Sequence, residues 1–252
     1  MALFLIGCGL GDARDLTLRA VEVLKRAEKV YLESYTSRPG ASVMEYAKLL
    51  GRPVGEALRE AVEEQAEQLL LLPALRQEIA LLVPGDPLAA TTHFALLARA
   101  KELDVEIHVL HHASVFTAIA ETGLSLYKFG RTVTLPFGGA PSIEELILRN
   151  QQAGLHTLVL FDLSPRQNQY MTLTEAVRAL RSLPAIRTLL SQGTQLVAAA
   201  ALGTTKQRIV CGTAEQLECT PLDPEPRCLI IPGALAHHEE DALRLWRPHR
   251  ES

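Results

Sequence analysis

Short apolar runs alternate with amphipathic segments along the first half of the chain, and turns rich in glycine or proline separate them. Short, uninterrupted apolar runs are typical of strands buried on both faces, and apolar residues at helical spacing are typical of surface helices. The expected strands are 2–6, 30–33, 78–83 and 106–110, and the expected helices are 15–29 (with Asp15 as N-cap), 42–50, 54–72 and 92–103. This alternation predicts an α/β fold with a mainly parallel sheet.

The second half of the chain continues as a second α/β pattern, with Pro184 expected to break or bend the helix that contains it. Its expected strands are 131–135, 156–162, 195–201, 207–211 and 228–231, and its expected helices are 114–121, 141–152, 173–191 and 241–246. The sequence contains no flexible linker between the halves. We therefore expect two closely packed α/β domains, residues 1–112 and 113–252.

Composition and charge narrow the class of protein. The chain has 252 residues, of which 48% are hydrophobic, enough to bury a core. Its net charge of -4 argues against a broad nucleic-acid surface, and no apolar stretch is long enough to span a bilayer. The apolar start lacks the basic residues of a signal peptide. The cysteines, which lack paired spacing, are expected to be reduced and buried: Cys8, Cys211, Cys219 and Cys228. We expect a cytoplasmic protein.

The first candidate for ligand chemistry is the glycine-rich segment 7–12, between a strand and a helix. Glycines there allow a ligand to approach the backbone closely, although a tight strand-to-helix turn explains them equally well. The dinucleotide fingerprint requires a third glycine where this chain has Asp12. Glu33 nevertheless ends the second strand, where a ribose-binding acid lies in such folds, so a nucleotide-linked oxidoreductase stays an alternative.

The second candidate is the loop 84–93, which also joins a strand to a helix. Ligands of open α/β sheets bind beyond the carboxyl ends of strands, so this loop and the first can face one crevice. Asp86, between Gly85 and Pro87, can accept hydrogen bonds from an amine or a ribose. The alternative is a type I turn in which Thr92 caps the next helix. We expect neighbouring residues, not the carboxylate of Asp86, to set the turn geometry.

A third group of polar residues follows the strand at 106–110. His111 and His112 are adjacent, so their side chains point apart and suit a metal poorly, and no cysteine or aspartate lies nearby at ligand spacing. We therefore expect no metal. Ser114 is expected to cap a helix, because the sequence identifies no base that would make it a nucleophile. His237 and His238 are expected to be solvated.

Taken together, the motifs resemble those of diphthine synthases, within the tetrapyrrole-methylase-like superfamily. Three of them are specific in combination: Tyr31-x-x-x-Tyr35-Thr36-Ser37, Asp86-Pro87-x-x-Ala90-Thr91-Thr92-His93 and Gly154-Leu155-His156-Thr157-Leu158. Further matches are 7–12, 113–115, 122–131, 170–172 and 229–233. The resemblance covers nearly the whole chain in order.

The resemblance implies a methyltransferase that uses S-adenosylmethionine, binds it in a cleft between two α/β domains and forms a homodimer. The implied reaction is N-methylation of 2-(3-amino-3-carboxypropyl)histidine on translation elongation factor 2, in diphthamide biosynthesis. By position, the implied donor contacts are Leu10, Asp86, Ala89, Ser114, Val115, Phe161, Leu202 and Arg227. No catalytic residue is implied, because a sulfonium donor chiefly requires orientation and exclusion of water. Neither a metal, a nucleic acid nor a membrane is implied as a partner.

The chain also departs from the family, mostly in its second half. Arg227 and Ala236 stand where histidines are usual, the segment 161–164 lacks the usual lysine, and the loop 136–141 is short. These departures keep two alternatives open. One is a superfamily methyltransferase acting on a corrinoid or tetrapyrrole precursor or another small molecule, and the other is a non-catalytic protein that binds S-adenosylmethionine.

Overall fold

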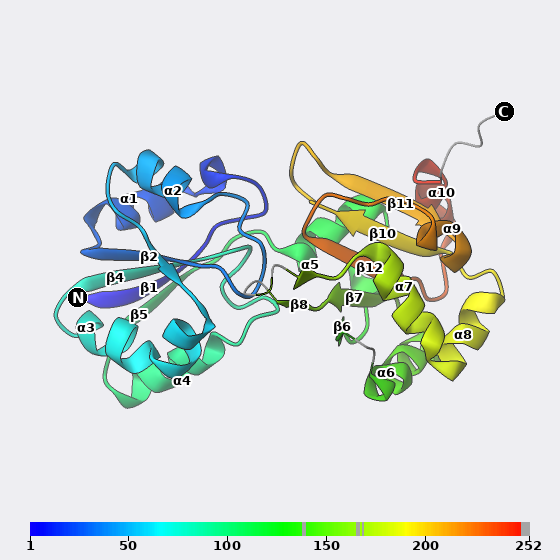
Figure 1. The fold of residues 1–252 in the computed structure, drawn as a ribbon, viewed down its shortest axis with the longest axis horizontal. Helices are drawn as coiled ribbons and strands as arrows, with labels where there is room; N and C mark the ends of the chain where they lie inside the picture. Colours follow the sequence, from blue (N-terminus) through cyan, green and yellow to red (C-terminus); the bar gives the residue numbers. More distant parts are fainter. Residues whose placement is uncertain (138–139, 165–166, 168, 248–252) are drawn as a thin grey trace. The chain divides into compact units, whose positions relative to one another are not determined.

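The structure is a computed structural model, and it describes residues 1–137, 140–164, 167 and 169–247. The chain divides into two compact units, Met1–Phe116 and Thr117–Ser252. Both units are α/β, as the sequence predicts (Figure 1). Among the described residues, no helix is long and apolar enough to cross a membrane.

Unit 1 is built on a five-stranded sheet in the order β3-β2-β4-β1-β5, and every neighbouring pair is parallel. The strands are β1 (Ala2–Gly7), β2 (Lys29–Glu33), β3 (Gly55–Ala57), β4 (Glu78–Val83) and β5 (Ile107–Leu110). Parallel strands all end at one edge of the sheet, so the loops after β1, β4 and β5 emerge together there. This carboxyl edge is where the sequence places its two candidate loops.

Helices cover both faces of the unit 1 sheet, as Figure 1 shows. They are α1 (Leu18–Arg26) and α2 (Val43–Leu50) on one face, and α3 (Leu72–Ala74) and α4 (Phe94–Glu102) on the other. Alternate residues of β1 serve the two cores: Phe4 and Ile6 face α1 and α2, while Leu3 and Leu5 join the second cluster. Burial on both faces explains why β1 is an unbroken apolar run.

The predicted starts of two helices that precede β4 were wrong. The helix expected from Asp15 begins at Leu18 and is capped by Thr17, whose side chain accepts from the Ala20 N–H (3.1 Å). The carboxylate of Asp15 accepts from the Gly11 N–H instead (2.7 Å). The helix expected over 54–72 begins with the short edge strand β3 and continues as two π-helical segments, Glu60–Glu64 and Glu67–Leu71.

Unit 2 contains a mixed sheet in the order β11-β10-β12-β7-β6. Only β6 pairs in parallel with β7, and the other neighbours are antiparallel. The strands are β6 (Val133–Leu135), β7 (Thr157–Phe161), β10 (Leu196–Ala200), β11 (Arg208–Gly212) and β12 (Arg227–Ile231), with a small ribbon of β8 (Leu163–Ser164) and β9 (Gln169–Tyr170). The predominantly parallel arrangement is therefore confined to unit 1.

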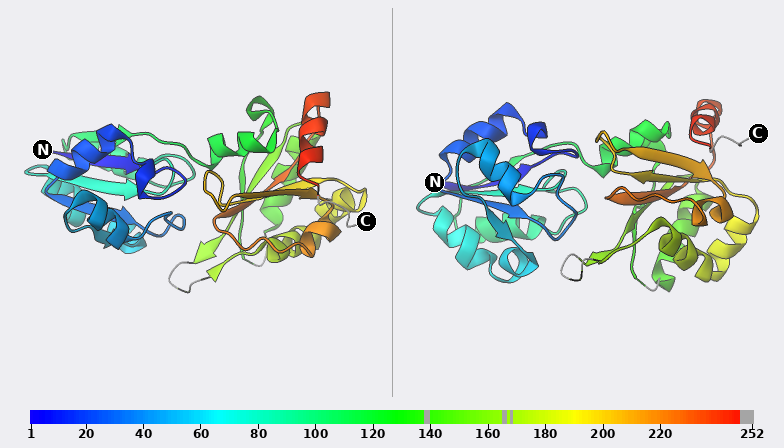
Figure 2. Two further views of the ribbon diagram at one scale, coloured as in Figure 1. Left: turned by 90° about the horizontal axis from the view of Figure 1, so that it is seen from above. Right: turned by 45° about the horizontal axis from the view of Figure 1, so that its top comes forward.

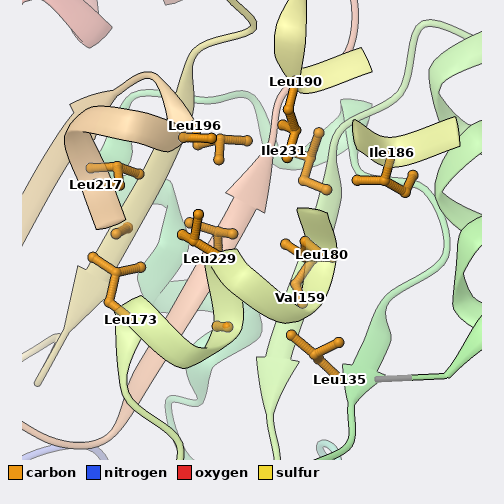
Figure 3. Close-up of a cluster of buried hydrophobic side chains, with 14 of the residues drawn as sticks. Leu135, Val159, Leu173, Leu180, Ile186, Leu190, Leu196, Leu217, Leu229 and Ile231 are labelled. Carbon is orange, nitrogen blue, oxygen red and sulfur yellow. The ribbon is translucent and has the colours of Figure 1, made fainter. Parts of the chain in front are cut away.

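The helices of unit 2 lie on both sides of its sheet (Figure 2). They are α5 (Val115–Ala118), which starts in unit 1, α6 (Pro141–Gln152), α7 (Leu173–Ser182), α8 (Pro184–Ser191), α9 (Ala214–Glu218) and α10 (His237–Leu245). Figure 3 shows the core under α7 to α9, where Leu180 and Ile186 pack with Leu229 and Ile231 of β12. Pro184 separates α7 from α8, which confirms the expected break.

Two further expectations for unit 2 were wrong in part. The last helix begins at His237, not at 241, because Glu239 in its first turn accepts from the Ala236 N–H (2.8 Å). His237 and His238 lie exposed in that turn, as expected. All four cysteines are free, but Cys219 is exposed at the end of α9 instead of buried.

Candidate active site

Backbone hydrogen bonds join the loops after β1 and β4 at the carboxyl edge of the unit 1 sheet. The Gly9 N–H donates to the Gly85 carbonyl (3.2 Å), and the Gly85 N–H donates back to the Gly9 carbonyl (2.9 Å). Both glycines have positive φ, +76° and +72°. Residues other than glycine rarely adopt this backbone conformation, so the conformation of the two predicted loops requires glycine at these positions.

Asp86 connects the loop after β4 to the end of β5. Its Oδ1 accepts from the Leu88 N–H (2.9 Å), and its Oδ2 accepts from the His112 N–H (3.0 Å) and from His111 Nδ1 (2.8 Å). Burial alone would raise the pKa of Asp86, but these hydrogen bonds outweigh it and the pKa is lowered. The expectation that the carboxylate does not shape the turn was therefore wrong, since it holds two loops together.

The other implied donor contacts of unit 1 lie in the same three loops. Leu10 follows β1 and Ala89 follows Asp86, and both are half-buried. Ser114 is buried, and its Oγ accepts from the Phe116 N–H (3.3 Å), which confirms its expected cap role beside Val115. A Cβ built on Gly85 would lie 3.8 Å from the Ala113 carbonyl and from Ser114, which is ordinary van der Waals contact, so the loops after β4 and β5 pack against each other at this point. The structure thus gathers all five residues at one edge of unit 1.

The two adjacent histidines point apart, as expected. His112 Nε2 donates to the Asp15 carbonyl (2.7 Å), and its Nδ1 accepts from the Ala113 N–H (2.7 Å). His111 turns to Asp86 and keeps 66% of its side chain exposed. Within the ranges that the structure describes, no group of three or more His, Cys, Asp or Glu side chains could hold a metal ion.

A buried network behind these loops explains two of the sequence motifs. Glu33 is completely buried and accepts from the backbone N–H groups of Tyr35 and Thr36 and from the Thr36 hydroxyl. His93, also buried, donates from Nδ1 to the Pro87 carbonyl (3.0 Å). Glu33 is therefore occupied within its own loop and is not placed as a ribose-binding acid.

Thr92 does not cap α4 as the alternative interpretation of its loop required. His93 occupies the N-cap position without a side-chain cap bond, and the Thr92 hydroxyl donates to Glu63 (3.0 Å). The helix starts at Phe94, two residues later than the sequence suggested.

The three implied donor contacts of unit 2 meet at one edge of its own sheet. Phe161 ends β7, and Arg227 starts β12 in register with Ala200 at the end of β10. Leu202 lies two residues beyond, after Ala201, whose N–H donates to the Pro226 carbonyl (2.8 Å) and whose φ is +47°. Because β7 and β12 are antiparallel, the end of one strand adjoins the start of the other.

The side chain of Arg227 is used to hold a neighbouring loop. Its guanidinium donates to the carbonyls of Leu222 (2.5 Å) and Asp223 (2.6 Å) and to the carboxylate of Glu225 (3.1 Å). Only 8% of the side chain is exposed. Arg227, which stands where the family has histidine, therefore fixes the segment that precedes β12.

Unit 2 has a buried carboxylate of its own, Glu239, at the opposite edge of its sheet, which was not among the residues predicted from the sequence. It accepts from the Ser125 N–H (2.9 Å), the Ala236 N–H (2.8 Å), His156 Nε2 (3.0 Å) and the Lys128 ammonium. Lys128 and His156 belong to motifs already noted in the sequence. A lysine and a histidine beside apolar strands could have indicated a buried acidic partner.

The remaining departures from the family lie near the Phe161 edge. Asp162 and Ser164 are half-buried, and Asp162 Oδ2 accepts from the Phe137 N–H (3.3 Å). Part of the short loop 136–141 falls at 138 and 139, outside the described residues.

Comparison with known proteins identifies the family. The family model described as Tetrapyrrole (Corrin/Porphyrin) Methylases matches residues 2–218. The chain belongs to this family and is a methyltransferase.

Relatives named as diphthine synthases match this chain almost end to end. A probable diphthine methyl ester synthase from Arabidopsis thaliana is 38% identical and covers 97% of this chain and 98% of its own length. The diphthine synthase of Methanococcus aeolicus is 34% identical, with 96% of each chain covered. A crystal structure of diphthine synthase superposes with a TM-score of 0.90 at 30% identity, over 98% of this chain and 97% of that one. These findings confirm the resemblance seen in the sequence.

Proposed function

We propose that this methyltransferase acts as a diphthine synthase. It transfers methyl groups from S-adenosylmethionine to the amino group of 2-(3-amino-3-carboxypropyl)histidine on translation elongation factor 2. The observation that carries the proposal is similarity over the whole length, in sequence and in fold, to proteins named for diphthine synthesis. The match includes unit 2, where the chain departs most from the family motifs.

The chemistry of the two candidate edges fits S-adenosylmethionine. In unit 1, the backbone of the three loops and the half-buried side chains of Leu10, Ala89 and Val115 offer polar groups beside apolar walls. Three of the roughly four acceptor positions of the Asp86 carboxylate are filled by the protein, which leaves one for a ligand. In unit 2, we assign Phe161, Leu202 and the backbone at Arg227 to the donor.

Bound S-adenosylmethionine would supply an electrophilic methyl group on a positively charged sulfur. The task of the protein is to hold the acceptor amine in line with this group and to exclude water. Rigid loops suit this task, and the loops of unit 1 are fixed to each other by the Gly9–Gly85 and Asp86 hydrogen bonds. The proposed reaction therefore depends on preorganised loops and requires no metal.

The test is a methyl-transfer assay with purified protein, labelled S-adenosylmethionine and elongation factor 2 that carries the unmethylated intermediate. We expect label on the modified histidine, located by mass spectrometry of the peptide. Factor with an unmodified histidine is the matched control and should stay unlabelled. The proposal fails if folded protein that binds the donor does not label the intermediate.

The same assay separates the alternatives. Turnover of a corrinoid or tetrapyrrole precursor, without turnover of the factor, would favour a small-molecule methyltransferase, as the family description allows. Donor binding without turnover of either substrate would identify a non-catalytic homologue. Tight binding of a nicotinamide cofactor in place of the donor would point to an oxidoreductase.

The relatives' names raise a question about the methylated atom, because some specify a methyl ester and others diphthine. An ester methyl group lies on a carboxyl oxygen and is released by mild alkali, whereas N-methyl groups are retained. Counting the methyl groups on the peptide before and after alkaline treatment therefore assigns each one. We expect N-methyl groups in the product.

The proposal also includes a homodimer that works in the cytoplasm beside its protein substrate. Light scattering of the purified protein tests the oligomeric state, and a monomer at working concentration would remove that part of the proposal without affecting methyl transfer.

A further inference from the structure

One histidine at the carboxyl edge of unit 1 combines an exposed ring with a buried carboxylate partner. His111 follows β5, and its Nδ1 lies 2.8 Å from Asp86 Oδ2. The side chain of His111 is 66% exposed, whereas that of Asp86 is 12% exposed. The backbone N–H groups of Leu88 and His112 fix the carboxylate from the other side, so the ring is held by a rigid partner.

This contact decides where the proton of His111 lies. An ionised carboxylate can only accept hydrogen bonds, so Nδ1 must be the protonated nitrogen. In the neutral ring, Nε2 then carries a lone pair on the side away from Asp86. His112, the adjacent titratable group, turns its own ring to the Asp15 carbonyl. His111 is thus an exposed base in a fixed tautomer, three residues before Ser114.

We propose, on the basis of the proposed function, that His111 is the general base for N-methylation and that Asp86 is its positioning residue. An amino group that carries a proton has no lone pair with which to attack. His111 Nε2 takes that proton, and the nitrogen forms its bond to the methyl carbon. The sulfur–methyl bond breaks with both electrons going to sulfur, and His111 releases its proton to water.

The proposal links the histidine to amine chemistry in particular. Each transfer to an amine that starts protonated requires removal of one proton, so repeated methylation uses the base repeatedly. Methylation of an ionised carboxylate requires no proton removal. Loss of His111 should therefore slow N-methylation and spare any ester formation.

The experiment compares His111→Gln and His111→Ala with His108→Gln. His108 lies on β5, near the end of the strand opposite to His111, and also contacts a carboxylate, that of Glu106 (3.0 Å). For each variant, turnover at saturating donor, donor affinity by calorimetry and melting temperature are measured with the factor substrate. We expect both His111 variants to lose about 10²–10⁴-fold in turnover, the usual contribution of a general base, with donor affinity within about threefold of wild type. His108→Gln should retain wild-type turnover.

Two further readouts separate a base from a structural residue. In His111→Gln, the acid limb of the turnover profile should move to higher pH, because the amine must then lose its proton to water. Added imidazole should partly restore His111→Ala. Wild-type turnover and an unchanged pH profile in the folded His111 variants would overturn the proposal while leaving the proposed function intact. Absence of turnover in the wild type would instead count against the proposed function.

Discussion

Unit 1 and unit 2 each contain a buried carboxylate that binds a histidine and two backbone N–H groups, but they expose that histidine differently. Asp86 holds His111, whose side chain is 66% exposed, while Glu239 holds His156, which is completely buried. Glu239 has the Lys128 ammonium as a further donor. The same hydrogen-bonding arrangement therefore stabilises the fold of unit 2, where the histidine is buried, and positions an accessible base in unit 1, where the histidine is exposed to solvent.

The two histidines also differ in how many of their ring nitrogens are hydrogen-bonded within the protein. His156 Nδ1 accepts from the Gly233 N–H (2.9 Å), so both of its nitrogens are used within the protein. Burial, together with the positive charge of Lys128, lowers the pKa of His156 although Glu239 raises it, and the hydrogen bond accepted by Nδ1 requires a neutral ring. A histidine with both nitrogens bonded can position backbone but cannot exchange a proton with a substrate.

The largest expected effect is on stability at Glu239. Replacing Glu239 with Ala leaves the Lys128 ammonium and two backbone N–H groups without this acceptor, and should cost about 3–5 kcal/mol of unfolding free energy. Urea unfolding measures the loss. Glu240→Ala, on the exposed side of the same helix turn, is the control and should change stability little. A loss of donor affinity with unchanged stability would contradict the assigned structural role.

Glu239 also predicts a pH dependence of stability. Burial alone would raise its pKa, but its hydrogen bonds lower the pKa from 4.5 to about 2. A carboxyl group with a lowered folded-state pKa stabilises the protein above about pH 4.5, and this contribution, at most about 3 kcal/mol, is lost as the pH falls toward about 2. Unfolding of wild type and Glu239→Gln should therefore converge on acidification. A constant difference between them down to about pH 2 would show that ionisation of Glu239 is not the cause.

A smaller loss of stability, combined with a loss of turnover, is expected at Asp86. Asp86→Ala leaves the N–H groups of Leu88 and His112 without their acceptor and should destabilise the protein by about 2 kcal/mol. It should also lower turnover, because His111 loses its partner. Melting temperature and methyl transfer are the measurements. If Asp86→Ala melts like wild type, the carboxylate does not hold the two loops together.

The smallest effect concerns strained alanines beside the implied donor contacts of each unit. Ala90 and Ala201 have φ of +58° and +47°. Replacing either with glycine should stabilise the protein by about 0.5–1 kcal/mol, because glycine adopts this conformation without strain. Asp104→Gly, at φ +52° beyond α4, is the control. If the strain shapes the donor loops, only the two alanine variants will bind the donor more weakly, as calorimetry would detect.

Strand positions followed from the sequence because each buried strand requires its own apolar run. The expected strand 78–83 coincides with β4, and the helix 141–152 coincides with α6. Helix starts were less predictable, because other backbone groups, near and far in the sequence, compete for the capping side chains. Asp15 did not cap α1, since its carboxylate binds the Gly11 N–H and its carbonyl accepts from His112.

The sequence by itself determined the α/β class, the loops after β1, β4 and β5, and the family, because apolar periodicity and glycine positions are local properties of the chain. Only the tertiary structure decided what the polar side chains of those motifs do. Asp86 and His111 are 25 residues apart, and His156 and Glu239 are 83 apart. Whether such a pair forms, and whether water reaches it, depends on how strands from distant parts of the chain pack together. That packing is why Asp86 holds an exposed histidine while Glu239 holds an enclosed one.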